Sequence, residues 1–395
     1  MPPRQRPRQR PRERDKRIKH YDSVLSLLLN HIQHSIMSLT YDEDVCQFVS
    51  SRGLLKSCKI RSANPMSSNP NDLEHVRIFI SEQDKYRHHL QTPVSIYVCC
   101  DAFHHFLQNY ASNITIPHYI VCGDGDLTMF HEVVPREKHN MFAMFMLHPN
   151  MRGLFSQNMD IQACRAFLTE KTTKLWTANA AIFKSENAPK TLEDAIQNVT
   201  QKLRQIPIGL DYHTIRAKPW HPWVTTEGGS REGKRTTPVE QEHILIREIR
   251  EVMKPFHQRK IRIYSNVMLC PDRFNDRVDA IREIPAALIS QQTTFLPRTQ
   301  TWRNMTEFAF VLSPFGNGMD CHRTWEALLC GCIPIVRSSV FNELFEGLPV
   351  LIVEKWSDIS LQLLVITLAD FKDKREKKEF NYDKLELSYY TRMFS

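Results

Sequence analysis

The sequence lacks the features that would assign it to a membrane or secretory class. Its 395 residues contain no apolar run of about 18, the length that a membrane-spanning helix needs. The N-terminus is charged and rich in proline, and no apolar segment of the kind found in a signal peptide follows it directly. No internal repeat is visible. We therefore expect a cytoplasmic protein, unless an anchor is missing from the sequence.

Cysteine patterns typical of metal sites are also missing. None of the ten cysteines forms a Cys-x-x-Cys pair, and their spacing is not that of a paired zinc site. Most of them lie within apolar segments, where a free thiol behaves as a small hydrophobic side chain. The pattern favours a reducing compartment and predicts no zinc site.

The positive charge is confined to the N-terminal end. Residues 1–19 carry nine Lys or Arg against two acidic residues, so they hold +7 of the formal net charge of +8. The rest of the chain is close to neutral, which argues against a basic nucleic-acid-binding surface on the folded part. Residues 1–20 alternate proline and arginine, and we expect them to form a disordered basic tail. Binding of nucleic acid through this tail stays an alternative function.

Beyond the tail, short apolar segments alternate with longer amphipathic ones, which is typical of doubly wound α/β domains with parallel sheets. Residues 21–38 predict an amphipathic helix packed on the first domain. The predicted strands are 76–80, 94–100, 117–122, 153–156, 206–210, 261–264, 308–312, 333–336 and 349–353. The predicted helices are 103–110, 191–204, 239–252, 273–290 and 358–370, the last capped by Ser357.

This pattern predicts two domains, at residues 21–215 and 239–372. The polar segment between them, residues 216–238, contains Pro and Gly and would be a linker or an active-site loop. Its Trp220 and Trp223 could stack on a sugar face, or they could anchor the loop by hydrophobic contact.

One stretch has the pattern strand, glycine loop, helix, strand. Residues 308–312 predict a buried strand, and Gly316, Asn317 and Gly318 form a loop that permits positive φ and close approach of a ligand. We expect Asp320 to cap the following helix and Gly331 to end it. The N-terminus of such a helix is an anion site, because its backbone N–H groups and dipole face the loop.

Arg323 and Glu326 lie three residues apart in this helix and therefore share one face. Beside a phosphate-sized loop, the arginine would suit phosphate charge and the glutamate the hydroxyls of a ribose. Spacing alone permits an ordinary ion pair between them equally well.

The stretch Ser313-Pro-x-Gly-x-Gly-x-Asp-x-x-Arg-x-x-Glu326-Ala-Leu-x-x-Gly331-Cys-Ile-Pro-Ile-Val336 resembles the nucleotide-sugar half of exostosin-like glycosyltransferases. Four shorter segments are similar to the compact family members of algae and large DNA viruses: 120–128, 155–158, 206–214 and 348–353. The resemblance implies the GT-B fold, in which two Rossmann-like domains face each other across a cleft. It also implies a C-terminal helical segment, residues 373–395, that crosses back to the first domain.

For the second domain, we expect a nucleotide-diphosphate sugar, usually a UDP-sugar in this family, at the carboxyl ends of the strands. The expected nucleotide-sugar residues are Arg298, Ser313, Gly316, Asn317, Gly318, Asp320, His322, Arg323 and Glu326. Arg298 is a candidate second phosphate clamp or a member of a surface ion pair. His322 could reach a phosphate or lie on the helix surface.

The same strand-end rule selects Asp124, Asp126, Asp211 and His213 in the first domain. Asp-Gly-Asp at 124–126 could hold a divalent ion, but GT-B enzymes generally need none, so we prefer Asp124 as the base that activates the acceptor. Turn stabilisation by Asp124 and helix capping by Asp211 stay alternatives. Asp211 is a second candidate catalytic residue, and Asp126 and His213 are expected on the acceptor side.

The sequence thus predicts an inverting, metal-independent glycosyltransferase that uses no resident cofactor and acts on a glycan or glycoprotein. A base, positive groups for the leaving diphosphate and a closed cleft would suffice for this chemistry. A catalytically inactive protein that still binds a nucleotide sugar is the first alternative, and a nucleic-acid-binding protein that acts through the basic tail is the alternative from another class.

Overall fold

The computed structural model describes residues 43–62, 73–87, 92–178, 189–212, 224–225, 234–235, 237–269, 272–294 and 296–395. Several expectations therefore lie outside the described residues: the basic tail, the helix at 21–38, His213, Trp220 and Trp223.

The first sheet is parallel and has the strand order β1-β2-β3-β4. Its strands are β1 (Val94–Cys99), β2 (His118–Gly123), β3 (Met151–Ser156) and β4 (Leu203–Gln205). All residues of β1 are buried, as expected for a parallel strand whose two faces are both covered. The predicted strands at 94–100, 117–122 and 153–156 are confirmed.

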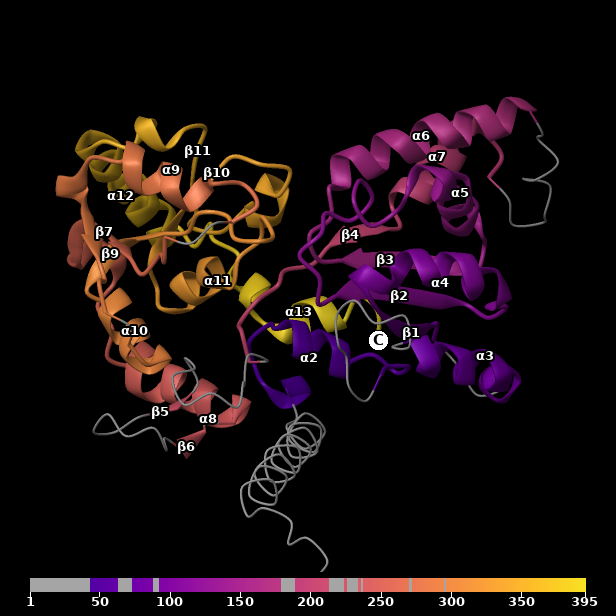
Figure 1. Cartoon of the computed structure of the whole chain (residues 1–395), viewed down its shortest axis with the longest axis horizontal. Helices are drawn as coiled ribbons and strands as arrows, with labels where there is room; N and C mark the ends of the chain where they lie inside the picture. The colour runs from indigo at the N-terminus through magenta and orange to yellow at the C-terminus, as the bar shows by residue number, and fades with distance from the viewer. Residues whose placement is uncertain are drawn as a thin grey trace, which may run out of the picture.

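The second sheet is also parallel and has the order β11-β10-β9-β7-β8. Its strands are β7 (Lys260–Ser265), β8 (Ile289–Gln291), β9 (Phe308–Leu312), β10 (Ile333–Arg337) and β11 (Leu351–Val353). A short antiparallel pair, β5 (Val224–Thr225) with β6 (Lys234–Arg235), lies in the segment that connects the sheets. Two parallel sheets with helices around them are compatible with two Rossmann-like units (Figure 1).

Helices surround both sheets. Those of the first lobe are α2 (Ser51–Lys56), α3 (Glu74–Arg87), α4 (Phe103–Asn109), α5 (His139–Leu147), α6 (Ile161–Ala178) and α7 (Leu192–Thr200). Those that follow are α8 (Pro238–His243), α9 (Asp276–Glu283), α10 (Arg298–Met305), α11 (His322–Leu329), α12 (Leu361–Glu376) and α13 (Leu387–Thr391). A π-helical segment, η7 (Ile244–Arg250), continues α8 directly.

Short 3-10 segments connect many of these elements. They are η1 (Glu43–Val45), η3 (Cys100–Ala102), η4 (Ala111–Asn113), η5 (Arg136–Lys138), η8 (Phe256–Gln258), η9 (Ala286–Leu288), η10 (Asn342–Phe345), η11 (Trp356–Asp358) and η12 (Tyr382–Leu385).

Several predicted elements are wrong or shifted. The expected strand 76–80 lies within α3, where buried Val76 and Phe79 are three residues apart and so share one face of a helix. Residues 206–210 follow β4, and Gly209 and Leu210 form only isolated bridges with Ser50. Within the described residues, the predicted helix 273–290 is the shorter α9. The last long helix is α12, capped by Ser360.

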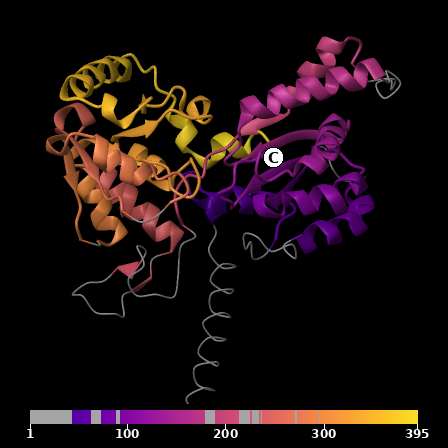
Figure 2. The ribbon, with the colours of Figure 1, turned by 45° about the horizontal axis from the view of Figure 1, so that its top comes forward.

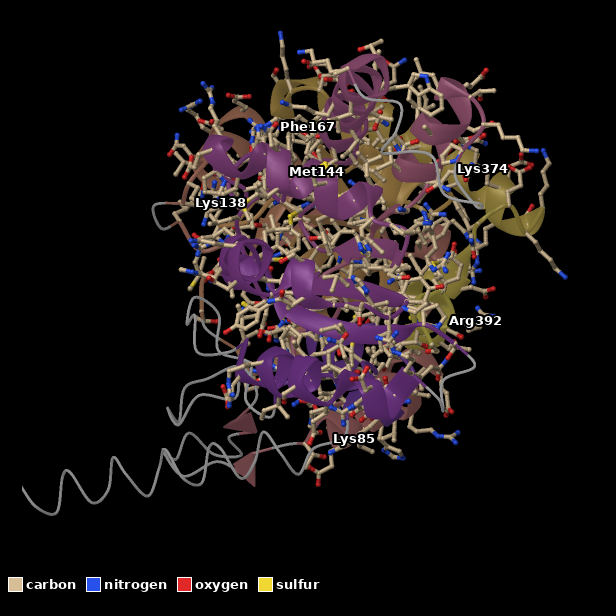
Figure 3. The ribbon with its side chains drawn as sticks, turned by 90° about the vertical axis from the view of Figure 1, so that its right-hand side faces the viewer. Lys85, Lys138, Met144, Phe167, Lys374 and Arg392 are labelled. Carbon is tan, nitrogen blue, oxygen red and sulfur yellow. The ribbon has the colours of Figure 1, made fainter. Side chains whose placement is uncertain are left out.

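The two faces of the first sheet are covered differently. Ile96, Val98 and Ile120 pack with α3 to α6, where Phe167 of α6 contacts Phe130 at a ring distance of 4.5 Å. Figure 3 views the molecule from this lobe, with Phe167 and Met144 of α5 labelled. The residues next to them in the strands face the other way, because side chains alternate along a strand.

A single hydrophobic cluster fills the space between the two sheets. It contains Tyr97, Val121 and Phe155 of the first sheet together with Trp325 of α11 and other residues of the second lobe. The lobes therefore share apolar surface, which favours one fixed arrangement over independent movement.

The chain returns to the first lobe at its C-terminal end. Leu387 donates its backbone N–H to Gln47 at 2.8 Å, and Phe394 packs on Phe155 with ring centres 5.3 Å apart. Figures 1 and 2 show this yellow segment between the two lobes.

Two glycines with positive φ differ in their surroundings. Gly209 has a φ of +66°, and a Cβ at this position would collide with the backbone carbonyl of Val49. Gly347 has a φ of +75°, but the nearest atom to its Cβ position is Cβ of Asn381 at 3.7 Å. Only the first position requires glycine for both conformation and space.

We predict that Gly209→Ala destabilises the protein much more than Gly347→Ala. The left-handed conformation alone costs about 1–2 kcal/mol for an L-residue, and this is the whole effect expected at Gly347. At Gly209 the collision with a backbone carbonyl adds to it. Urea unfolding of both variants measures the difference, and equal losses would mean that the backbone at Val49 yields at little cost.

Candidate functional site

The glycine loop connects β9 to α11 at the carboxyl end of the second sheet, as the sequence predicted. The strand spans Phe308–Leu312, and the helix ends before Gly331, whose φ is +66°. Buried Ser313 accepts or donates a hydrogen bond with Thr324 of α11, with 2.8 Å between the two hydroxyl oxygens. The loop is therefore held against the first turn of the helix.

The glycines of this loop serve close packing, and Gly316 and Gly318 do not adopt the positive φ that glycine permits. A Cβ on Gly316 would lie 2.9 Å from Nη2 of Arg277, and a Cβ on Gly318 would lie 3.1 Å from the amide of Asn158. The loop thus approaches an arginine of its own lobe and an asparagine of the other.

Part of the predicted backbone anion cradle is already occupied. Gly316 donates its N–H to the carbonyl of Gly318 at 3.0 Å, and Phe315 donates to Asp276 at 2.9 Å. These two backbone N–H groups of the loop are therefore used within the protein and are not available to an anion.

Asp320 joins the two lobes and does not cap the helix. Cys321 occupies the N-cap position. The carboxylate of Asp320 accepts from the backbone N–H of Ile208 and from Nε1 of Trp325, both at 2.8 Å. The side chain thus links the first lobe to α11. Burial raises the pKa of Asp320 to about 7, although the N–H groups of Ile208, Trp325 and Cys321 favour the ionised form.

His322 forms another contact between the lobes. Its Nδ1 donates to the carbonyl oxygen of Gly209 at 2.7 Å, because a carbonyl can only accept. The ring therefore lies at the junction, half-buried, and the alternative of a histidine on the exposed helix surface is wrong.

Three arginines converge beside the glycine loop. Nε of Arg323 donates to Asn266 at 2.7 Å. The pKa of Arg323 is lowered to about 10, chiefly by burial and also by the nearby charges of Arg277 and Arg298. Cys321 opposes this lowering. Within the described residues, no carboxylate forms an ion pair with Arg323.

The other two arginines have acidic neighbours. Arg277 lies 3.9 Å from Asp272. Arg298 pairs with Oε1 of Glu326 and lies 3.3 Å from Oδ2 of Asp211. Burial lowers the pKa of Arg298, and Asp211 raises it.

These contacts decide two of the open alternatives. Glu326 is 2% exposed and pairs with Arg298, not with its helix neighbour Arg323. The side chain of Arg298 is 14% exposed and pairs with buried Glu326, so this is not a surface ion pair. Asp211, predicted as a catalytic residue, has its carboxylate at this arginine.

Acidic residues gather at the carboxyl end of the first sheet. Asp124 has a φ of +62°, and its N–H donates to Gln157 at 3.0 Å. Asp101 follows β1, and its Oδ1 lies 3.0 Å from where a Cβ on Gly125 would sit. Burial raises the pKa of Asp101, and the charges of Asp126 and Asp124 raise it further. The conformation of Asp124 and its amide bond support a role in the turn, and its carboxylate lies in this acidic group.

Arg273 and Asn158 bring the two loops together. Nη1 of Arg273 donates to the carbonyls of Asp126 and Asn317, each at 3.1 Å. Nδ2 of Asn158 donates to Gly125 at 2.9 Å, and its Oδ1 accepts from the N–H of Asp320 at 3.3 Å. The Asp124 loop therefore lies next to the glycine loop, as the strand-end rule predicted.

Sequence reasoning missed Asp101, Arg277, Arg273 and Asn158. The rule that selected Asp124 also applies to Asp101, which comes two residues after β1. Asn158 lies in a segment that already resembled the family. Arg277 and Arg273 had no such signal, because their role depends on contacts with distant loops.

Within the described part of the chain, no three His, Cys, Asp or Glu side chains are grouped to hold a metal ion. No helix there is long and apolar enough to cross a bilayer. Comparison with protein-family models and with characterised proteins gives no match.

We predict a pH dependence of folding that depends on Asp320. Because its pKa of about 7 in the folded state lies above the ordinary aspartate value of 3.8, the folded state keeps a proton that the unfolded chain has released between these pH values. Its contribution to stability is therefore complete below pH 4 and is lost as the pH rises through 7. The loss should be on the order of a few kcal/mol.

The measurement is the free energy of unfolding of wild type and Asp320→Asn from pH 4 to pH 8. The free energy of unfolding of wild type minus that of Asp320→Asn should fall as the pH rises from 4 to 8. Asp370→Asn, at an exposed position of α12, is the control and should run parallel to wild type. A constant difference for Asp320→Asn would contradict the prediction.

Proposed function

We propose that the protein is a glycosyltransferase of the GT-B type that uses a nucleotide-diphosphate sugar, with UDP-sugar as the first candidate. The observation that carries the proposal is the group of Arg277, Arg298 and Arg323 beside the glycine loop. Such a group suits two linked phosphates, which need several positive charges in a site away from bulk water.

The donor would lie on the side of the second sheet. Arg323 supports this placement, because it is half-buried and no carboxylate among the described residues forms an ion pair with it. A diphosphate would supply the missing negative charge. Glu326 has two carboxylate oxygens, so it can keep Arg298 on Oε1 and accept a ribose hydroxyl on Oε2.

The acceptor would approach from the first sheet, where Asp101, Asp124 and Asp126 gather. An acceptor hydroxyl oxygen attacks the anomeric carbon, the bond from this carbon to the diphosphate breaks, and the diphosphate leaves with the electron pair. A carboxylate takes the hydroxyl proton. Because the hydroxyl attacks in a single displacement from the face opposite the diphosphate, the configuration at the anomeric carbon inverts. The arginines stabilise the charge that develops on the leaving group, and no resident cofactor takes part.

Asp124 is the first choice as base, and Asp101 is the second. Asp124 is partly exposed beside the glycine loop, whereas Oδ1 of Asp101 is buried and has no hydrogen-bond partner within the described residues. Asp211 is the third choice, because its Oδ2 already faces Arg298.

We predict that Arg323→Gln weakens binding of the donor. A hydrogen bond to a charged group contributes about 1.5–3 kcal/mol, so the dissociation constant should rise roughly 10- to 100-fold. Thermal shift with UDP-, GDP- and CMP-sugars identifies the donor on wild type, where a ligand at 100 times its dissociation constant stabilises by about 2.7 kcal/mol.

The matched control is Arg282→Gln, an exposed arginine of α9 in the same lobe. It should bind the donor as wild type does. If no nucleotide sugar stabilises the wild type, or if Arg323→Gln binds normally, the proposed donor site is wrong.

We predict that removal of the base lowers turnover and leaves donor affinity nearly unchanged. Asp124→Asn should reduce the rate by about 10²–10⁴-fold, and Asp126→Asn should have a smaller effect. Release of the nucleotide diphosphate, measured with an acceptor found by a glycan screen, gives the rate.

Asp101→Asn is assayed in parallel. A larger loss there than in Asp124→Asn would assign the base to Asp101. Donor binding without any turnover in wild type would favour the inactive binding protein. Loss of activity with a chelator and its return with Mn²⁺ would instead make 124–126 a metal site.

A further inference from the structure

A cavity lies in the same lobe as the candidate donor site, at the opposite edge of the sheet. Its volume is about 450 Å³, within the usual range of ligand pockets. Lys260, the first residue of β7, lines it, whereas Asn266, which contacts Arg323, follows the last residue of that strand. Six residues of strand separate the two places by roughly 20 Å.

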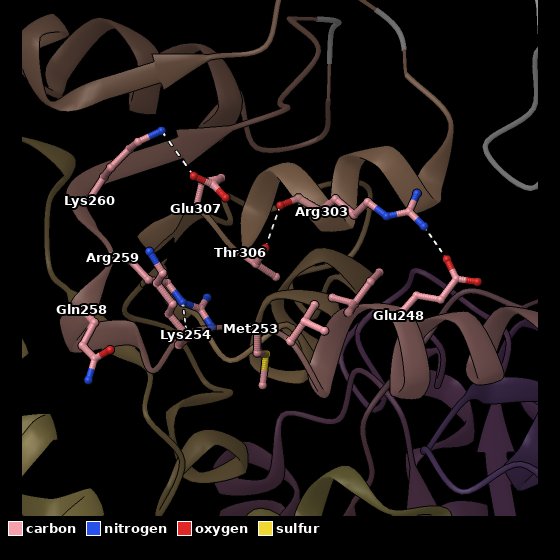
Figure 4. Close-up of a pocket in the computed structure, with 11 residues that line it drawn as sticks. Glu248, Met253, Lys254, Gln258, Arg259, Lys260, Arg303, Thr306 and Glu307 are labelled. Atoms are coloured by element: carbon pink, nitrogen blue, oxygen red, sulfur yellow. Dashed lines mark hydrogen bonds and ion pairs between the residues drawn. The ribbon is translucent and has the colours of Figure 1, made fainter.

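The walls of the cavity combine an apolar side with several charges (Figure 4). Ile249, Val252 and Met253 form the apolar side. Two of the lining cations are neutralised, because Arg303 pairs with Glu248 and Lys260 lies 3.5 Å from Glu307.

The other two lining cations, Lys254 and Arg259, have no acidic partner in the described part of the chain. Lys254 is exposed, and Arg259 is 7% exposed. Together they leave the cavity with an excess of two positive charges. A buried cation without a counter-charge is unfavourable, so this imbalance calls for an anion.

The guanidinium of Arg259 is only partly used by the protein. Nε donates to the carbonyl of Lys254 at 2.7 Å, and Nη1 donates to the carbonyl of Cys330 at 3.0 Å. Nη2 is buried and has no hydrogen-bond partner among the described residues. Nη2 lies 3.0 Å from the Cβ position of Gly331 and the methyl carbon of Met253 lies 2.9 Å from the same position, so the methionine that lines the cavity is a close neighbour of this nitrogen.

The nearby thiol does not supply the missing charge. Sγ of Cys332 lies 3.2 Å from Nη1 of Arg259. Burial raises the pKa of this thiol to about 11, against the lowering effect of the arginine, so the thiol is neutral at physiological pH.

One wall of the cavity has an unusual backbone. Glu248 and Ile249 lie in the π-helical segment η7, where Glu251 donates its N–H to the carbonyl of Ile246, five residues earlier, at 3.2 Å. Such segments are rare and often occur at functional sites.

We propose that this cavity binds a small organic anion, a phosphate or carboxylate group on a compact apolar body. The oxyanion lies between Lys254 and Arg259, where it reaches Nη2 after the unbranched side chain of Met253 turns aside. The apolar body lies against Ile249 and Val252. This site is separate from the donor site and does not depend on the proposed transferase activity.

The test uses phenyl phosphate and benzoate as probes and benzamide as the neutral match, with the full chain and calorimetric titration at constant ionic strength. At least one anion should bind, and benzamide should bind at least tenfold more weakly. Lys254→Gln, at an exposed position, should weaken the anion about tenfold. Arg259→Gln, provided that this variant folds, should weaken binding of the anion more than Lys254→Gln does.

Two control variants show which site the probe occupies. Arg323→Gln changes the donor site, and Lys355→Gln removes an exposed lysine elsewhere in the lobe; both should bind the probe as wild type does. The proposal is overturned if neither anion binds, if benzamide binds equally well, or if Lys254→Gln has no effect. Loss of binding in Arg323→Gln would also overturn it, because the probe would then occupy the donor site.

Discussion

The buried carboxylate of Asp320 determines how the glycine loop and the first lobe fit together. One oxygen accepts from the backbone of Ile208 in the first lobe, and the other accepts from Trp325 in α11. A carboxylate that is 2% exposed is costly unless both oxygens are satisfied. The first lobe, the glycine loop and α11 must therefore take up their positions together. Asn158 adds a further contact, because its Oδ1 accepts a hydrogen bond from the backbone N–H of Asp320.

Charge balance beside this junction is a second constraint. Arg298 has Glu326 and Asp211, and Arg277 has Asp272, but Arg323 has no acidic partner among the described residues. Among these three arginines, only the charge of Arg323 is not balanced by a carboxylate of the described residues. It lies where the carboxyl ends of β7 and β9 come together and where Gly316 lets Arg277 approach the loop.

Local features of the site could be predicted from the sequence, because strand, loop and helix depend on neighbouring residues. The limits of β9 and the end of α11 before Gly331 are examples. The partners of Asp320 and Glu326 could not be predicted. Arg298 and Ile208 are distant in the chain, and these contacts overrode the expected helix cap and the expected ion pair. Val76 and Phe79 were misread as a strand, because a short apolar run fits both periods.

The two ends of α11 show why one arginine indicates a ligand more strongly than another. A cation near a helix C-terminus is favourable, since the last carbonyls carry partial negative charge. Arg259 has this role, because its Nη1 binds the carbonyl of Cys330. Only its Nη2 is left for an external anion. Arg323 lies in the first turn, where the dipole disfavours a cation, and neighbouring arginines add repulsion. No acidic side chain within the described residues pairs with Arg323 to offset this cost, so a bound anion would give its position a physical reason.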